Sequence, residues 1–572
     1  MNMNIKYIFV AILACVSASN LAVAQDLDPT VVVNSKYEGK LVKMNKPSFE
    51  MAMPDSLTRF DLDFDYLVFH QPYKVSGAFS PHILTMKPAA VASESSQLYL
   101  NAGAGYTLHP TLDLVWSPIR GRKFRLDVYA DHRSYVGGYR SFDLQGSKDY
   151  WNGYDLKSRA GVEGRMELSS LSAGFDVSYY GLASKDLNKN RMYDALDVRL
   201  GVSSKPKNAS YFKYDVLAAY RFAEDKLQYY RYGREYLSEH LVNLDATLGQ
   251  VFGGGHQILM DVGCDVAVYA PAAVGQLSFV PRYLLTKERW GVDAGVRVSA
   301  IIRSENSEGM FSTRGQIVYP DVKAYYSVIP DAMRLYVNVG GGNKLNTYAS
   351  LLDRNHHTDI YYGIGNMGLM NVTVERVSAA LGLEGRVGTL FSYNLHGGYV
   401  NYASDVLDAV VLTTDPVSGE DVYLPGFGYS AYQKCFAAAD WRLVSDDFRF
   451  DGDIQYTYAW GLNNPVGLFN PAALTGDVSF EYNWSQRIFA GVDCNFSTGR
   501  HGREWVKIPG GPATEDAVIP GYVDLGVNFE YAVNRSFSVW ARGGNLLDMT
   551  IQRNPLFAEK GINFTVGICL NL

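Results

Sequence analysis

The feature that most constrains this chain is a strict alternation of residue types near its C-terminal end. In residues 562–572, large apolar side chains occupy every second position, and small or polar residues lie between them. The apolar members are Phe564, Val566, Ile568, Leu570 and Leu572. Successive side chains of a β-strand point to opposite faces, so this run predicts a strand with one apolar face. Residues 523–531 alternate in the same way.

About 22 segments with this pattern follow one another from residue 97 onward. In 194–203, for example, Leu196, Val198, Leu200 and Val202 alternate with polar residues or glycine. No apolar run after residue 25 approaches the ~18–20 residues that a membrane helix needs. A chain that crosses a membrane with strands must close them into a barrel, because an open sheet edge leaves backbone groups without partners in lipid.

The lengths of the connections support a membrane barrel. Short connections such as 169–170 and 387–388 alternate with long ones such as 136–157 and 343–371, apart from short connections at 107–110 and 271–274. Bacterial membrane barrels have short turns on one side, long loops on the other and an even number of strands. We therefore predict an all-β fold over residues 96–572, namely a transmembrane, antiparallel, up-and-down β-barrel of about 22 strands. Its last strand would pair with its first and so remove both edges.

The N-terminal residues resemble a secretory signal. Lys6 precedes an apolar stretch at 7–16, and Ala22-Val23-Ala24 forms a cleavage site, which predicts a signal peptide at 1–24 and a mature chain from about Gln25. A lipoprotein site at Cys15 is the alternative. Residues 25–95 are less regular and form a separate N-terminal segment, periplasmic or within the lumen. Together with the barrel, the signal predicts the cell outer membrane of a Gram-negative bacterium, with outer-membrane lipid as a partner.

Composition and motifs exclude several function classes. The formal charge of −7 gives no reason to expect nucleic acid as a partner. Motifs for a serine hydrolase, a zinc protease, a nucleotide-binding loop or a dinucleotide fold are lacking, so we expect neither an enzyme nor a cofactor. Four cysteines of the mature chain, including Cys264 and Cys494 on apolar faces, are expected to be fillers rather than metal ligands.

Three segments near the C-terminal end carry a family resemblance. They read YVDLGVN at 522–528, WARGGNLLD at 540–548 and GINFTVG at 561–567. In these segments the chain resembles the barrel of TonB-dependent outer-membrane receptors. The resemblance implies a 22-stranded barrel, ligand uptake or surface binding, and TonB as a partner. The residues Thr30, Val31, Val32, Val33 and Asn34 are similar to the TonB box of that family, although an ordinary strand would have the same composition.

The chain departs from this family at its N-terminal end. The family places a plug domain of well over a hundred residues before the barrel, whereas only about 70 residues lie between the signal and the first strand here. Residues 26–95 could fold into the lumen as a reduced plug, or a partner or inward-folded loops could close the barrel. The alternative function is therefore a plug-less scaffold that anchors surface or periplasmic lipoproteins or joins outer-membrane assembly or export complexes.

Two long loops carry the candidate ligand-binding residues, and loop 404–428 is a third expected recognition loop. Loop 223–237 is rich in tyrosine and arginine, which are enriched in binding surfaces, although these residues could equally form an aromatic girdle at the lipid headgroups. Loop 343–371 holds two adjacent histidines, for which ordinary loop polarity is the alternative to ligand or metal binding. The candidates are Tyr229, Tyr230, Arg231, Tyr232, Arg234, His356, His357, Tyr361 and Tyr362.

Overall fold

The computed structural model describes most of the chain from residue 97 to its end. The described ranges are 97–106, 109–142, 148–186, 189–206, 208–229, 233–269, 272–304, 311–330, 332–358, 370–414, 421–462, 467–508 and 511–572. Within these ranges, no helix combines the length and the apolar character that a membrane crossing requires. The signal peptide, the segment 25–95 and the TonB-box-like residues 30–34 lie outside the described residues and stay predictions.

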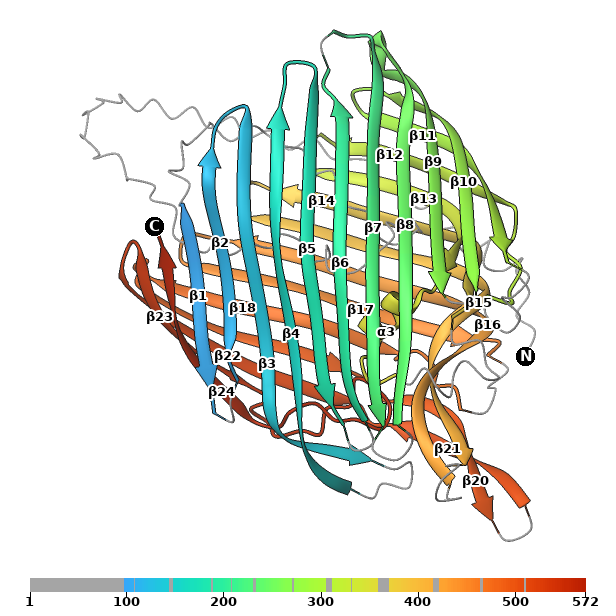
Figure 1. Cartoon of the computed structure of the whole chain (residues 1–572). Coiled ribbons are helices and arrows are strands. Elements are labelled where there is room, and N and C mark those ends of the chain that lie inside the picture. The colour runs from blue at the N-terminus through green and yellow to red at the C-terminus, as the bar shows by residue number, and fades with distance from the viewer. Residues whose placement is uncertain are drawn as a thin grey trace, which may run out of the picture. The chain divides into compact units, whose positions relative to one another are not determined.

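Twenty-two strands form one antiparallel sheet, and two further strands form a separate hairpin (Figure 1). The strands are β1 (Leu98–Gly105), β2 (Thr111–Arg120), β3 (Phe124–Phe142), β4 (Lys148–Glu167), β5 (Leu171–Lys185), β6 (Lys189–Ser204), β7 (Tyr211–Tyr229), β8 (Gly233–Phe252), β9 (His256–Tyr269), β10 (Ala273–Thr286), β11 (Trp290–Arg303), β12 (Val318–Ile329), β13 (Met333–Leu345), β14 (Val372–Val387), β15 (Phe391–Thr414), β16 (Asp421–Val444), β17 (Phe448–Trp460), β18 (Leu474–Trp484), β19 (Ile488–Ser497), β20 (Arg500–Ile508), β21 (Gly511–Ile519), β22 (Tyr522–Asn534), β23 (Phe537–Gly544) and β24 (Asn563–Asn571). The described helical elements are η3 (Gly253–Gly255) and α3 (Tyr348–Arg354).

The sheet closes on itself, which confirms the predicted barrel and its 22 strands. Each strand pairs with its neighbours in the chain, except that β19 pairs with β22 across the β20–β21 hairpin. The last strand, β24, pairs with β1 over seven residue pairs, from Tyr99 opposite Asn571 to Gly105 opposite Thr565. No edge of this sheet is left to pair with another chain.

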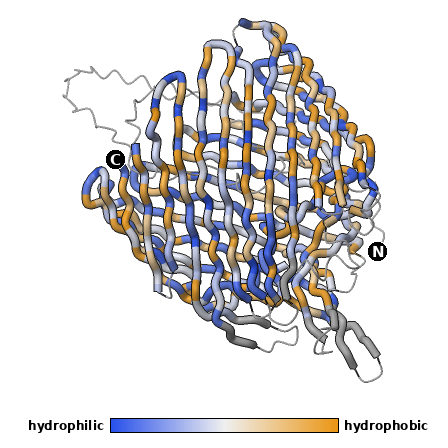
Figure 2. The backbone as a smooth tube through the Cα atoms, in the orientation of Figure 1, coloured by the Kyte–Doolittle hydropathy of each residue, from blue (hydrophilic) through white to orange (hydrophobic). Residues whose placement is uncertain are grey.

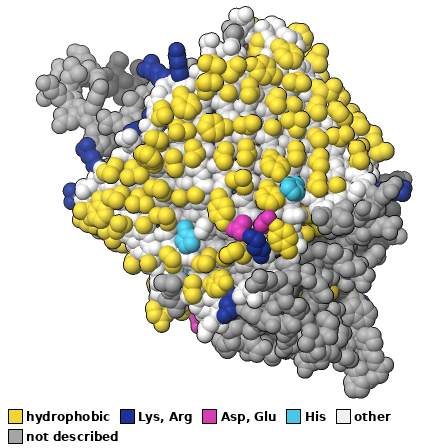
Figure 3. Space-filling model, in the orientation of Figure 1, with side chains coloured by type: hydrophobic (Ala, Val, Ile, Leu, Met, Phe, Trp, Pro, Cys, Tyr) yellow, Lys and Arg dark blue, Asp and Glu magenta, His cyan; other side chains and the backbone are white. Residues whose placement is uncertain are grey.

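The outer face of the barrel is apolar and the inner face is polar. On β24, Phe564, Val566 and Ile568 are exposed, whereas Cys569, which directly follows Ile568, is buried on the other face. The same alternation of hydrophobic and hydrophilic residues follows the strands in Figure 2, and apolar side chains cover the strands on the face shown in Figure 3. Such a surface is stable in lipid and not in water, so the fold is a membrane barrel.

A close approach of backbones shapes the seam between β1 and β24. Gly103 lies directly opposite Gly567, and the indole ring of Trp540 on β23 lies against both. A Cβ atom on either glycine would collide with this ring. The indole Nε1 donates a hydrogen bond to Asn101 Oδ1 (2.5 Å), so the ring of β23 is tied to β1 across β24.

Long loops were expected on one side of the barrel, here called the loop side, which is the lower side in Figure 1. Several of these segments have a different structure. The expected loops 223–237 and 404–428 consist largely of strand, because β7 and β8 extend to 229 and 233, and β15 and β16 extend to 414 and 421. The β20–β21 hairpin lies in the connection between β19 and β22. A membrane strand needs only ~9–11 residues to cross lipid. The 24-residue strands β15 and β16 therefore continue beyond the membrane, where packing and not lipid sets the residue pattern.

Candidate functional site

A short helical segment lies inside the barrel at its loop side. This segment, residues 346–358, contains α3 and contacts side chains of β6, β7, β8 and β9. The contacted side chains include Arg191, Asp225 and Glu239, all buried, whereas Met192 beside Arg191 is exposed on the lipid-facing side. The segment therefore packs against the inner wall. We call residues 346–358, with 406–410 and 467–470, the loop-side cap.

Charged wall residues match the two ends of α3. At its N-terminal end, the Glu239 carboxylate accepts a hydrogen bond from the Ala349 amide (3.2 Å), and the Tyr269 hydroxyl accepts one from the Tyr348 amide (3.0 Å). Thr347 caps the same end through its hydroxyl. Free amide groups at a helix N-terminus carry partial positive charge, so a carboxylate stabilises that end.

Two positively charged side chains of the wall donate hydrogen bonds to the backbone that follows α3. Lys189 Nζ donates to the carbonyl oxygen of His357 (3.0 Å), and Arg191 donates to the carbonyl oxygens of His356 and Thr358. A charged donor makes a stronger hydrogen bond to a carbonyl oxygen than a neutral donor does, so these contacts fix the chain that leaves α3. The wall thus places an acid at the start of α3 and two bases on the segment that follows it.

A buried ion pair lies beneath this segment. The side chains of Arg191 and Asp225 have no solvent exposure, and Arg191 Nε lies 3.1 Å from Asp225 Oδ2. The Tyr348 hydroxyl of α3 donates to the same carboxylate. Burying a carboxylate costs several kcal/mol of desolvation free energy, so it stays charged in the interior only where cations and hydrogen-bond donors surround it. The buried carboxylate of the wall is therefore stabilised partly by the cap, and the cap is held in place by the charged residues of the wall.

The extended β15–β16 hairpin completes the cap. Arg354 at the end of α3 and Arg500 on β20 both pair with the buried carboxylate of Asp408 on β15. The backbone of Val410 donates to Gly467 (2.8 Å), and that of Phe469 donates to Asp408 (3.0 Å). Segments from four loop-side connections therefore form one packed unit.

The two predicted histidines belong to this cap, and their rings lie against each other. The ring centroids of His356 and His357 lie 4.0 Å apart, and the ring of His357 stacks on Phe557 at 4.0 Å. Burial, and then nearby positive charge, lowers the pKa of both imidazoles well below the usual value. His356 Nε2 lies 3.4 Å from Asp155. Among the described residues, no three His, Cys, Asp or Glu side chains gather as a metal site would require.

The other candidate residues are placed less fully. Tyr229 ends β7, and Arg234 lies near the start of β8, so the structure describes their backbone as strand. Tyr230, Arg231, Tyr232, Tyr361 and Tyr362 lie outside the described residues. The role of these seven residues in ligand binding stays a prediction.

Sequence reasoning missed the wall residues that hold the cap. Lys189, Arg191, Asp225 and Glu239 all lie on the polar face near the loop-side ends of their strands. A charge on that face also suits a water-filled lumen, so the pattern alone does not distinguish an anchor from a solvated residue. The only usable sequence signal was that positively and negatively charged residues occur close together near the loop-side end of each of these strands.

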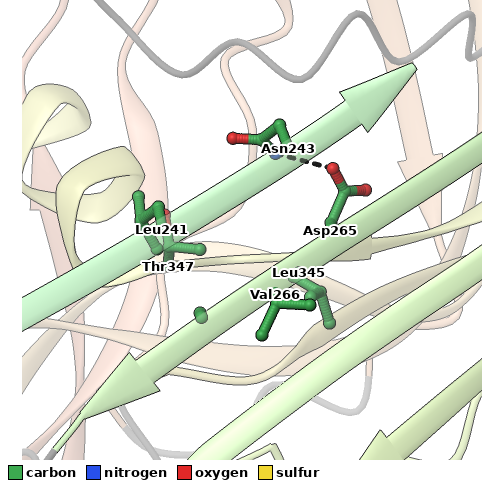
Figure 4. Close-up of a pocket in the computed structure, with 7 residues that line it drawn as sticks. Leu241, Asn243, Asp265, Val266, Leu345 and Thr347 are labelled. Atoms are coloured by element: carbon green, nitrogen blue, oxygen red, sulfur yellow. Dashed lines mark hydrogen bonds between the residues drawn. The ribbon is translucent and has the colours of Figure 1, made fainter. Parts of the chain in front are cut away.

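Two cavities adjoin the cap. The first lies between β8, β9 and the start of the cap segment, lined by Leu241, Asn243, Asp265, Val266, Ala267, Leu345 and Thr347 (Figure 4). Its volume of about 10 Å³ suits one water at most, and Asn243 donates to Asp265 beside it (2.6 Å). The second is larger, about 340 Å³, and is lined by Thr313, Asn371, Ala403, Ser404, Tyr429, Ser430 and Ala431.

Comparison with known proteins identifies the fold. No family model and no curated protein matches the sequence. Among solved structures, the copper transporter OprC superposes with a TM-score of 0.59 at 12% identity, over 84% of this chain and 83% of that chain. The FrpB iron transporter from Neisseria meningitidis (F5-1 variant) gives 0.60 at 8%, over 84% and 82%. The siderophore receptor PirA from Acinetobacter baumannii gives 0.57 at 10%, over 83% and 80%.

These structures are TonB-dependent receptors, so the resemblance predicted from the C-terminal segments is confirmed at the level of the fold. Identities of 8–12% show a shared barrel architecture alone. The residues that bind a ligand must therefore be argued from this chain's own geometry.

Proposed function

We propose that this protein is an outer-membrane receptor of a Gram-negative bacterium that captures a ligand at its loop side for uptake or surface binding. The carrying observation is the loop-side cap, which is anchored on the inner wall by Lys189, Arg191 and Glu239. Binding residues are commonly carried on loops that a rigid scaffold positions. The similar structures bear the names of transporters and receptors, which supports the same class for this barrel.

Uptake further requires energy from the inner membrane, and the proposed contact is Thr30–Asn34 pairing with TonB as an added strand. Such pairing uses main-chain hydrogen bonds of an extended segment. A photoreactive amino acid placed singly at positions 28–36 should crosslink to TonB in cells. Val32→Pro removes a backbone donor and should abolish the crosslink, whereas the matched change Val32→Ile should retain it.

A second candidate is the scaffold barrel, and the anchoring of the cap by the wall itself favours it. A cap anchored by the wall itself is compatible with a barrel that needs no full plug. A single preparation of the crosslinked protein distinguishes the two functions. TonB crosslinks without a stoichiometric partner support uptake, whereas absent crosslinks together with a stable co-purifying lipoprotein would overturn it.

A further inference from the structure

The two histidines of the loop-side cap lie in an enclosed place and take no part in the proposed function. The ring centroids of His356 and His357 lie 4.0 Å apart, and Phe557 stacks on His357 with the two ring planes 10° apart. On the wall side, Asp155 of β4 contacts the His356 ring, and Arg191 of β6 holds the backbone of the same residue. The pair is therefore enclosed between a C-terminal loop and the wall strands β4 and β6.

Three positively charged side chains of the wall act on this pair. Lys189 and Arg191 donate to the carbonyl oxygens of residues 356–358, and Lys157 on β4 supplies the third charge. Burial, followed by these three charges, lowers the pKa of His356 well below its usual value. Burial, followed by the neighbouring imidazole, lowers the pKa of His357 in the same way. A proton added to either ring therefore meets positive charge in the closed cap.

Negative charge near the pair does not offset these cations. The Asp155 carboxylate lies 3.4 Å from His356 Nε2, and the face of Phe557 also favours a charged ring, although more weakly. Asp353 of the cap is exposed to solvent. The other acids around the pair are engaged elsewhere, namely Asp225 with Arg191, Asp186 with the Lys189 amide, Glu559 with Arg553, and Asp408 with Arg354. The closed cap thus favours two neutral rings.

The rings belong to the same residues through which the wall holds the cap. Because Lys189 and Arg191 bind the carbonyl oxygens of residues 356–358, a ring that moves away from positive charge draws these oxygens from their donors. In water an imidazole regains its ordinary pKa of about 6.5. Below that pH the opened cap binds protons that the closed cap does not, so acid shifts the equilibrium towards opening.

We propose that the histidine pair is a proton-operated latch, in which protonation of His356 or His357 releases residues 356–358 from Lys189 and Arg191 and opens the loop-side cap. The latch controls access to the inner wall from the loop side. It goes beyond the proposed function and does not depend on it, since a receptor and a scaffold barrel could both carry such a cap. Failure of the latch would leave both candidate functions standing.

The test counts the protons that opening takes up. Amide exchange of residues 346–358 is measured on the full-length protein in detergent between about pH 7.5 and about pH 5, and each rate is divided by the intrinsic rate at that pH. The slope of the logarithm of this ratio against pH gives the number of protons bound on opening. We expect almost no slope above pH 7 and a rise of about tenfold per histidine between about pH 6.5 and about pH 5.5. His356→Gln and His357→Gln should each reduce the rise by about tenfold, relative to the same variant at neutral pH.

His256→Gln is the matched control. His256 begins β9 at a short turn, on the side of the barrel opposite the cap, and contacts Tyr283, so this variant should keep the slope of the unmodified protein. Peptides from β11 and β12 report on the barrel itself and should show no pH dependence of their corrected exchange. The latch is overturned if exchange of 346–358 does not rise with acid in the unmodified protein, if both single variants keep its slope, or if β11 and β12 open in parallel.

Discussion

Replacing Arg191 with methionine should release the loop-side cap from the wall. Methionine keeps much of the length and apolar volume of the arginine side chain but removes its charge and all its donors. The change removes the ion pair with Asp225 and the hydrogen bonds to the carbonyl oxygens of His356 and Thr358. The barrel strands themselves keep their backbone pairing, so the effect should be confined to the cap.

The magnitude follows from the burial of the pair. Both side chains of the pair are fully buried, and removing one partner of such a pair costs about 3–5 kcal/mol. The Asp225 carboxylate keeps the hydrogen bond from Tyr348, so the lower figure applies. A loss of about 3 kcal/mol corresponds to a roughly 100-fold larger population of the opened cap. The double variant Arg191→Met/Asp225→Asn leaves no unpaired charge and should recover most of the loss.

Amide hydrogen exchange of residues 346–358, followed by mass spectrometry on the detergent-solubilised protein, measures this opening. We expect exchange in this segment to rise about 100-fold in Arg191→Met, by the arithmetic above, and to fall back in the double variant. Arg297→Met is the control, because the Arg297–Asp321 pair (3.0 Å) lies on β11 and β12, away from the cap. Unchanged exchange in Arg191→Met, or equal exchange in all three variants, would refute the anchoring role of the buried pair.

Two further predictions follow from the histidine pair and from the closing strand. Since the pKa values of His356 and His357 are depressed in the closed cap, the opened cap binds more protons below about pH 6.5, so closure should weaken as pH falls through that value and be insensitive above it. Exchange of 346–358, corrected for intrinsic rates, should therefore rise between about pH 7.5 and about pH 5.5; the double variant His356→Gln/His357→Gln should flatten this dependence, and an identical slope in both proteins would contradict it. Deletion of residues 564–572 removes the partner of β1 and leaves two sheet edges, so the protein should fail to insert and be degraded. Surface labelling of cells measures this, and normal surface levels of the truncated chain would disprove the closing role.

The membrane-spanning part of the fold was predictable because one rule governs it. Lipid on one side and water on the other force alternation, as on β24, where Phe564 is exposed and Cys569 is buried. Beyond the membrane this rule ends. From Val406 to Val410 on β15 every residue is buried, because the cap packs on both faces of the strand. Alternation disappears there, and the extended hairpin was therefore interpreted as a loop.

The candidate site was less predictable because its contacts join distant parts of the chain. Lys189 and His357 are separated by 168 positions, and no local pattern indicates that they meet. The bulge of β15 is a further case, since Ala403 and Ser404 lie opposite the single residue Ala431 and no local pattern in the sequence marks the extra residue. The histidine pair was found as a candidate by its composition, but its stacking on Phe557 depends on a loop about 200 residues away.

The glycine pair at the seam has a consequence for how the barrel is assembled. A closing strand could in principle slide along its partner in steps of two residues without exposing an apolar face to water. Because Trp540 stands opposite Gly567, sliding β24 together with β23 by one such step would bring Asn101 or Gly105 of β1 beside the indole ring in place of Gly103. Asn101 would bring a side chain into the space of the ring, and either step would break the hydrogen bond between Trp540 and Asn101 as it now stands. Trp540 therefore stabilises the observed register between the first and last strands over registers shifted by two residues.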